Sequence, residues 1–233
     1  MANFQSSKLG TKDYWDNVYK EELENFAEHG DEGEIWFGED SMEKMLTWTS
    51  ENVPSDKSPN IVEVGMGNGL LLVSLVEQGY DGAHLCGIDF SPESVQLAQG
   101  IAQHRGEQTA KIVYRQADFL RDPVQSLEHM TQPPLWDLVL DKGTYDAISL
   151  AEKKSDEPSP ASLYPPKVVE YLAPGGLFLI TSCNFTEEEL RAAFETPSTG
   201  LQYHSRIAHK TYTYGGKTGS ICSTVAFQKA AES

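Results

Sequence analysis

The chain has 233 residues, of which 39% are hydrophobic and 10% are aromatic. A chain of this length and composition can bury a substantial core, which argues against a disordered protein and favours one folded domain. Its formal net charge of -17 disfavours direct binding to nucleic acid, because acidic side chains repel the phosphate backbone, and it is compatible with a basic protein partner.

The N-terminal residues are expected to form helices that precede the core. Apolar side chains recur at helical spacing between residues 13 and 26, which predicts an amphipathic helix. A second helix is predicted over residues 41–50, with Ser41 as its N-cap. A segment rich in proline, serine and charge follows and is predicted to be a linker. The chain is therefore predicted to form a single domain over residues 1–233, with a helical appendage and linker at 1–58 and a core at 59–233.

Short apolar strands alternate with helical segments through the core. Repeated βα units predict a doubly wound α/β fold, with a mostly parallel seven-stranded sheet and helices on both faces. Two late strands around a glycine-rich turn predict an antiparallel C-terminal hairpin. Such a fold binds its ligand beyond the carboxyl ends of the strands. The predicted strands are residues 60–64, 84–89, 111–116, 135–141, 176–181, 202–209 and 220–227, and the predicted helices are residues 70–78, 92–103, 124–129, 162–172 and 187–194.

A glycine-rich segment follows the first core strand and is the strongest signal of a ligand site. Its glycines allow the backbone to approach a ligand closely, and the following helix N-terminus offers N–H donors, although a tight βα turn is the alternative. The dinucleotide fingerprint needs its third glycine where this chain has Leu70. Glu63 would repel a pyrophosphate but suits a sulfonium and an ammonium, the charges of S-adenosylmethionine. The predicted cofactor contacts in this segment are Glu63, Gly65, Gly67, Asn68 and Gly69.

Acidic residues also end the next two strands. Asp89 can accept hydrogen bonds from both hydroxyls of a ribose, and it is followed by Phe90 and by Ser91, a predicted N-cap; a purely structural cap is the alternative. Asp118 can accept from an adenine amino group beside the ring face of Phe119, although a plain turn explains this pair equally well. We therefore expect these residues to contact the cofactor.

These three strand ends together resemble the class I methyltransferase pattern over about residues 59–184. The resemblance implies a Rossmann-like fold and S-adenosylmethionine as the cofactor. The fourth strand runs into Asp141-Lys142-Gly143-Thr144-Tyr145-Asp146-Ala147 and lacks the N/D-P-P-Y/F motif of many small-molecule and amide methylases. This string is similar to that of the eukaryotic enzymes that methylate lysine on translation elongation factor 1-alpha, of the lysine methyltransferase 2 type.

Three other segments are similar to the same family. They are Tyr14-Trp15-Asp16 with Tyr19, the segment from Gly33 to Gly38, and the turn from Thr211 to Gly219. The resemblance therefore covers nearly the whole chain and implies a protein-lysine N-methyltransferase that uses S-adenosylmethionine. A small-molecule or RNA methyltransferase on the same fold, or a scaffold that binds the donor without catalysis, stays open.

The residues nearest to the chemistry are expected around the fourth strand end. Asp141 is the first candidate, because a carboxylate can orient the acceptor amine and take its proton, and it is also predicted to contact the cofactor; a structural strand-end acid is equally consistent. Tyr145 is the second catalytic candidate, with Asp146 beside it. Trp36 and Phe37 are expected to cover the donor or to line the lysine slot, which Tyr212 and Tyr214 can also flank.

The remaining expectations concern location, metals and assembly. No apolar run approaches the roughly 20 residues that span a bilayer, and the first residues lack the apolar core of a signal peptide. The widely spaced cysteines Cys86, Cys183 and Cys222 favour reduced thiols and hence a cytoplasmic protein, with a nuclear location also open. Without a CxxC pair or an HExxH motif, no metal site is expected. A monomer is sufficient.

Overall fold

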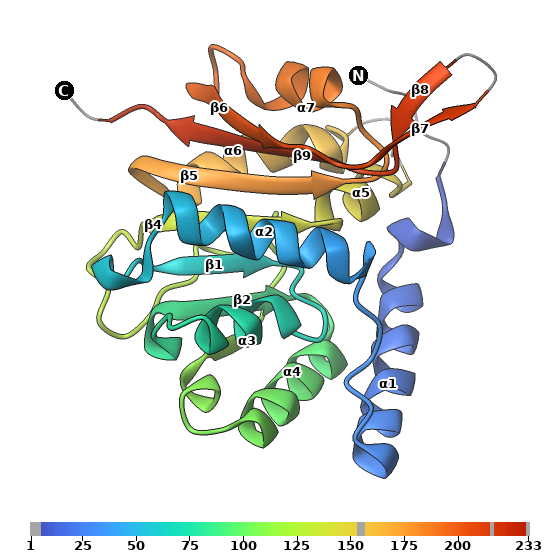
Figure 1. Cartoon of the computed structure of the whole chain (residues 1–233), viewed down its shortest axis with the longest axis vertical. Helices are drawn as coiled ribbons and strands as arrows, with labels where there is room; N and C mark the ends of the chain where they lie inside the picture. The colour runs from blue at the N-terminus through green and yellow to red at the C-terminus, as the bar shows by residue number, and fades with distance from the viewer. Residues whose placement is uncertain (1–5, 153–156, 215–216, 232–233) are drawn as a thin grey trace.

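The computed structural model describes residues 6–152, 157–214 and 217–231. A seven-stranded sheet with the order β3-β2-β1-β4-β5-β9-β6 forms its centre (Figure 1). Strands β1 to β5 run parallel to one another, and β9 runs antiparallel to both β5 and β6. The sheet strands are β1 (Ile61–Val64), β2 (Leu85–Asp89), β3 (Val113–Gln116), β4 (Trp136–Lys142), β5 (Leu172–Ser182), β6 (Leu201–Ile207) and β9 (Ser223–Lys229).

Helices pack on both faces of the sheet and create two buried clusters. One cluster joins α2, α3 and α4 to the sheet through residues such as Met45, Leu72 and Leu97. The other joins α5, α6 and α7 through Tyr145, Tyr164 and Phe194. The helices are α1 (Lys12–His29), α2 (Gly38–Asn52), α3 (Leu70–Glu77), α4 (Pro92–Arg105), α5 (Thr144–Ser149), α6 (Pro160–Tyr171) and α7 (Glu187–Phe194).

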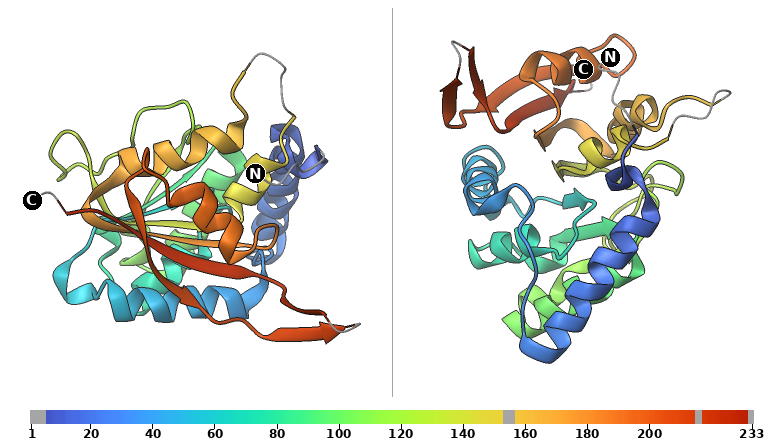
Figure 2. Two further views of the ribbon diagram at one scale, coloured as in Figure 1. Left: turned by 90° about the horizontal axis from the view of Figure 1, so that it is seen from above. Right: turned by 90° about the vertical axis from the view of Figure 1, so that its right-hand side faces the viewer.

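The predicted mostly parallel sheet and its antiparallel C-terminal pair are confirmed. The second strand of the predicted hairpin, β9, lies between β5 and β6, so that β6 becomes the edge strand. The turn between them forms a separate two-stranded ladder, β7 (Thr211–Tyr214) with β8 (Lys217–Ser220). Figure 2 shows this ladder extending beyond the main sheet. The predicted site residues Tyr212 and Tyr214 lie in it, and their side chains fall outside the described part of the structure.

The helix predicted over residues 124–129 is wrong. This stretch is irregular, and both backbone groups of Gln125 bond to side chains outside it: Trp136 donates its indole N–H to the Gln125 carbonyl (3.1 Å), and the Gln125 amide donates to the Tyr171 hydroxyl (3.4 Å). A helix that the sequence did not predict, α5, begins directly after Gly143, whose φ of 91° ends β4.

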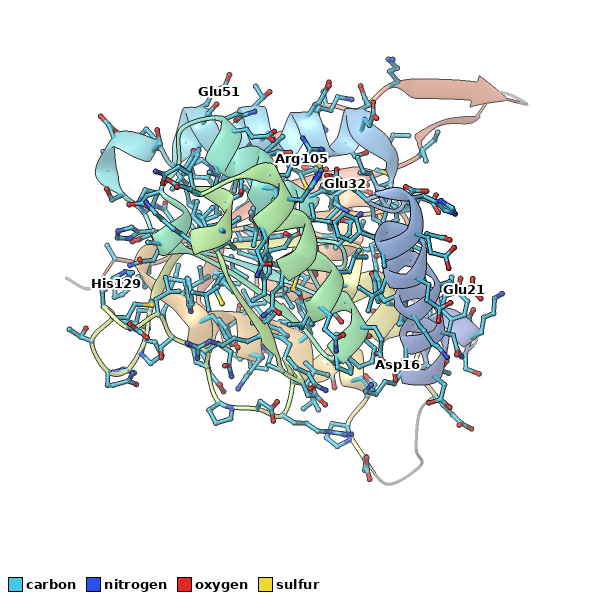
Figure 3. All side chains as sticks on the ribbon, turned by 90° about the horizontal axis from the view of Figure 1, so that it is seen from below. Asp16, Glu21, Glu32, Glu51, Arg105 and His129 are labelled. Atoms are coloured by element: carbon cyan, nitrogen blue, oxygen red, sulfur yellow. The ribbon has the colours of Figure 1, made fainter. Side chains whose placement is uncertain are left out.

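The N-terminal segment crosses the carboxyl edge of the sheet. In Figure 1 the arrowheads of β1 and β5 point toward α1, which packs against α4. The loop between α1 and α2 is fixed by Arg105 of α4, which donates from its guanidinium to both oxygens of Glu32 (2.7 and 2.5 Å; Figure 3). Asn68 donates its side-chain amide to the carbonyls of Glu32 and Glu34 (3.0 and 3.2 Å). The loop is therefore held against the core on both sides.

Within the described ranges, no helix is both long and apolar enough to span a bilayer.

Candidate active site

A cavity of about 490 Å³ opens at the carboxyl ends of the parallel strands. It lies where the chain order of the sheet reverses, between β1 and β4, the usual ligand position in such folds. Loops after β1, β2, β3 and β4 form one side, and the N-terminal segment forms the other. Of the predicted cofactor residues, those that line the cavity are Trp36, Gly65, Gly67, Asn68, Asp89, Phe90, Asp118 and Phe119.

The glycines after β1 have different physical roles. Gly65, Gly67 and Gly69 all adopt positive φ, at 61°, 57° and 72°. A Cβ on Gly67 would lie 2.7 Å from the hydroxyl of Tyr19, so this glycine permits α1 to close over the loop. A Cβ on Gly69 would lie 2.9 Å from the Cβ of Ala98, so Gly69 serves the packing of α4 and does not line the cavity.

Asp89 holds this glycine loop at the cavity wall. One carboxylate oxygen accepts from the Gly67 amide (3.1 Å), and the other accepts from the Ser91 amide (2.9 Å). Burial raises the pKa of the Asp89 carboxyl to about 6, which the backbone hydrogen bonds only partly oppose. Ser91 itself lies behind the cavity and caps α4 through its hydroxyl, as predicted from the Ser-Pro pair. Asp89 is thus a buried acceptor that faces a ligand space.

The end of β3 supplies the next part of the wall. Asp118 is partly exposed, and one of its carboxylate oxygens accepts from the Leu120 amide (3.0 Å). Phe119 is buried against the rings of Tyr164 and Tyr171, with centroids 4.8 and 5.1 Å away. An acceptor therefore stands beside an immobilised ring, which suits a flat base with an exocyclic amine.

Glu63 is buried next to the cavity and interacts electrostatically with Lys142. Burial raises the pKa of Glu63 to about 8, and the charge of Lys142 works in the other direction. Burial also lowers the pKa of Lys142, which lines the cavity and donates to the Trp36 carbonyl (3.2 Å). Glu63 does not reach the cavity wall, and its Oε2 has no hydrogen-bond partner among the described residues.

The two predicted catalytic residues lie outside the cavity lining. Asp141 is fully buried, and its carboxylate accepts from the Thr144 amide (2.8 Å), the Tyr145 amide (3.0 Å) and the Tyr164 hydroxyl (2.5 Å). Burial raises its pKa to about 7. The ring of Tyr145 is also buried, against Phe194 among others. This geometry does not support direct contact with a reacting group, and we infer that both residues position α5.

The cavity also contains residues that were not predicted to bind the cofactor. Asp146 lines it and accepts from the Ser182 hydroxyl (2.5 Å) and from the amides of Cys183 (2.8 Å) and Asn184 (3.2 Å). From the N-terminal segment, Leu9, Gly10, Lys12, Trp15 and Tyr19 also line it. Helical periodicity predicted that Trp15 and Tyr19 lie on the packed face of an amphipathic helix, but only the fold shows that this face closes a cavity.

Comparison with known proteins assigns the chain to a family. Residues 55–224 match the family described as "Methyltransferase domain". The chain is a member of this methyltransferase family. The methyltransferase is 39% identical over 239 residues to the protein-lysine N-methyltransferase efm4 of Schizosaccharomyces pombe, covering 98% of this chain and 97% of that one. It is 37% identical to the EEF1A lysine methyltransferase 2 of Homo sapiens, covering 97% of this chain and 89% of that one. The family resemblance inferred from the motifs is confirmed.

Solved structures confirm the Rossmann-like class I fold of the methyltransferase. A magnesium protoporphyrin IX methyltransferase from Synechocystis PCC 6803, determined with bound SAM, superposes with a TM-score of 0.58 at 13% identity and covers 91% of this chain and 97% of its own. The [4+2]-cyclase SpnF superposes with a TM-score of 0.66 at 12% identity, covering 98% of both chains. Because a cyclase shares the fold, the fold alone does not define the reaction.

Proposed function

We propose that this methyltransferase transfers a methyl group from S-adenosylmethionine to a lysine side chain of translation elongation factor 1-alpha. The similarity to the lysine methyltransferases carries the proposal, because it reaches 35–39% identity and extends along nearly the whole chain. We further propose a cytoplasmic monomer without a nucleic-acid partner. The net charge of -17 supports a basic protein as the acceptor.

The cavity fits the donor. Its volume of about 490 Å³ lies in the usual range for small-molecule sites, about 300–1,000 Å³. Gly67 presents its backbone without a side chain at the wall, and Asp89 presents a buried carboxylate there. In the proposal, Asp89 receives the ribose hydroxyls and Asp118 with Phe119 receives the adenine. Bound S-adenosylmethionine supplies an electrophilic methyl group on a sulfonium.

The acceptor amine must lose its proton to react. A lysine amine has a pKa of about 10.4 in water, so it is mostly protonated at neutral pH. Trp36 and Phe37 line the cavity, and an apolar, aromatic surrounding disfavours the charged amine and lowers its pKa. Holding amine and methyl group in line then supplies much of the rate acceleration.

Donor affinity should depend on pH through Asp89. Its pKa is raised to about 6, so the carboxyl takes up a proton as the pH falls through that value. The protonated form loses acceptor capacity for ribose hydroxyls, and affinity for S-adenosylmethionine should fall about tenfold per unit below pH 6. Isothermal titration between pH 5 and 8 measures this profile. In Asp89→Asn the affinity should be lower throughout and flat between pH 5 and 7; an unchanged slope in this variant would assign the titration to another group.

The proposed function is tested by transfer of label from S-adenosylmethionine to purified elongation factor 1-alpha. Mass spectrometry should locate the label on lysine, and the variant Gly67→Asp, in which the new side chain fills the loop, should transfer none. Labelling of RNA or of small molecules with an unlabelled factor would favour the alternative enzymes. Donor binding without transfer to any acceptor fraction would favour a scaffold.

A further inference from the structure

Phe37 has an unusual backbone conformation at the edge of the cavity. Its φ of 65° and ψ of 8° place a bulky, non-glycine residue in the left-handed region, directly before α2. Side chains with a Cβ rarely adopt this conformation, and such strain persists where the surroundings fix it and tends to cluster at functional sites. In Figure 1 the start of α2 lies on the side of the molecule toward which β1 and β5 point.

Contacts on both sides fix this conformation. The ring of Phe37 lies directly on Gly143 at the end of β4, since a Cβ on Gly143 would come within 2.9 Å of the ring. Lys142 holds the preceding residue by donating to the Trp36 carbonyl (3.2 Å). The Gly38 amide closes the turn on the Ile35 carbonyl (2.9 Å). The aromatic side chain is therefore held against the end of β4, at the wall of the cavity.

Phe37 and Asp146 line the same cavity, as do Gly143, on which the Phe37 ring lies, and Asn184 after β5. Asp146 uses its oxygens to accept from Ser182, Cys183 and Asn184, which leaves about one of the roughly four acceptor positions of a carboxylate free. One cavity therefore offers an apolar ring, which suits an aliphatic stem, and a buried carboxylate with a free acceptor position, which suits an amine.

We propose that Phe37 forms the aromatic wall of the acceptor slot and contacts the substrate lysine, with Asp146 on the opposite side. The inference rests on the proposed function. It assigns to Phe37 a contact with the acceptor lysine and none with S-adenosylmethionine. In the transfer, the nitrogen lone pair forms the new N–C bond while the C–S bond breaks and its electrons stay on sulfur. The amine proton leaves to solvent. Phe37 positions the amine for this displacement and excludes water from its stem.

The test separates acceptor binding from donor binding. In Phe37→Leu the KM for elongation factor 1-alpha should rise about tenfold or more, while the Kd for S-adenosylmethionine stays within about twofold. Phe37→Tyr keeps the ring and should stay close to the wild type. Phe26→Leu is the matched control, because the ring of Phe26 also packs on a glycine, Gly100, but lies outside the cavity lining. Thermal unfolding with bound donor checks that each variant folds.

A second variant and a binding assay with a small amine test the role of Phe37 independently of the protein acceptor. Phe37→Asn removes the ring with a residue that tolerates the left-handed backbone, which covers the case that Phe37→Leu does not fold. n-Butylamine, the chemical end of a lysine, is titrated into enzyme saturated with S-adenosylhomocysteine, and its affinity should fall about fivefold or more in both variants. The affinity for n-butylamine can be measured whether or not elongation factor 1-alpha is the acceptor. Absence of transfer to that factor would therefore contradict the proposed function and not the role of Phe37. Equal losses of donor and acceptor affinity, or an unchanged amine affinity, would overturn the role of Phe37.

Discussion

Replacing Asp89 by alanine is expected to reduce the affinity for S-adenosylmethionine about a hundredfold or more, equivalent to about 2.7 kcal/mol. The variant loses the acceptor for the ribose in the proposed complex. It also leaves the amides of Gly67 and Ser91 without the carboxylate that orients them, and each buried unsatisfied donor costs about 1–3 kcal/mol. Isothermal titration at pH 8, where the wild-type carboxyl is ionised, gives the comparison.

The matched control for this variant is Asp137→Ala. Asp137 likewise accepts from a backbone amide, that of Asn60 (2.8 Å), but it lies at the start of β4, away from the cavity. This variant should bind the donor with wild-type affinity although it is less stable. If Asp89→Ala folds and binds as tightly as this control, the carboxylate only orients the backbone of Gly67 and Ser91.

Replacing Asp141 by alanine is expected to lower the free energy of unfolding by about 4 kcal/mol, since truncating one partner of a buried polar network leaves the others unsatisfied. The Tyr164 hydroxyl and the amides of Thr144 and Tyr145 all lose their acceptor in a site without solvent. For a chain of this size the melting temperature should fall by about 10 °C. Urea unfolding followed by circular dichroism measures the change.

Tyr164→Phe separates a positioning role of Asp141 from a catalytic one. It removes one hydroxyl from the same network and should cost about 1–2 kcal/mol. Its rate of methyl transfer should stay near the wild-type value. A catalytic carboxylate would behave differently: Asp141→Asn would then keep most of the stability and lose nearly all of kcat, and that result would restore Asp141 to the chemistry.

The sequence predicted which residues after β1 to β3 line the cavity better than which residues after β4 do so, and strand geometry explains the difference. Strand ends and glycine loops are local features, so Gly65, Gly67 and Asp89 were placed correctly at the cavity. Asp141 and Lys142 are neighbours in sequence, but side chains alternate across a strand. Lys142 reaches the cavity, whereas Asp141 turns under α5, a helix too short for periodicity to reveal.

The irregular stretch before β4 is a second case in which the local sequence pattern predicted the wrong structure. Residues 124–129 have helical spacing, yet their backbone is held by Trp136 and Tyr171, which are remote in sequence. Contacts of this kind depend on how separate elements pack together, so a short segment of sequence does not reveal them. The closure of the cavity by Trp15 and Tyr19 is another example, because it depends on where α1 docks.

The N-terminal segment forms a part of the cavity wall that lies outside the residues matched to the family. The match to the methyltransferase family begins at residue 55, yet the cavity wall also includes eight residues between Leu9 and Phe37. The shared part of the family therefore carries the glycine loop and Asp89, and a fragment beginning at residue 59 would expose one side of the cavity to water. The shape of the cavity can then change through exchange of the N-terminal segment alone, while the glycine loop and Asp89 stay the same.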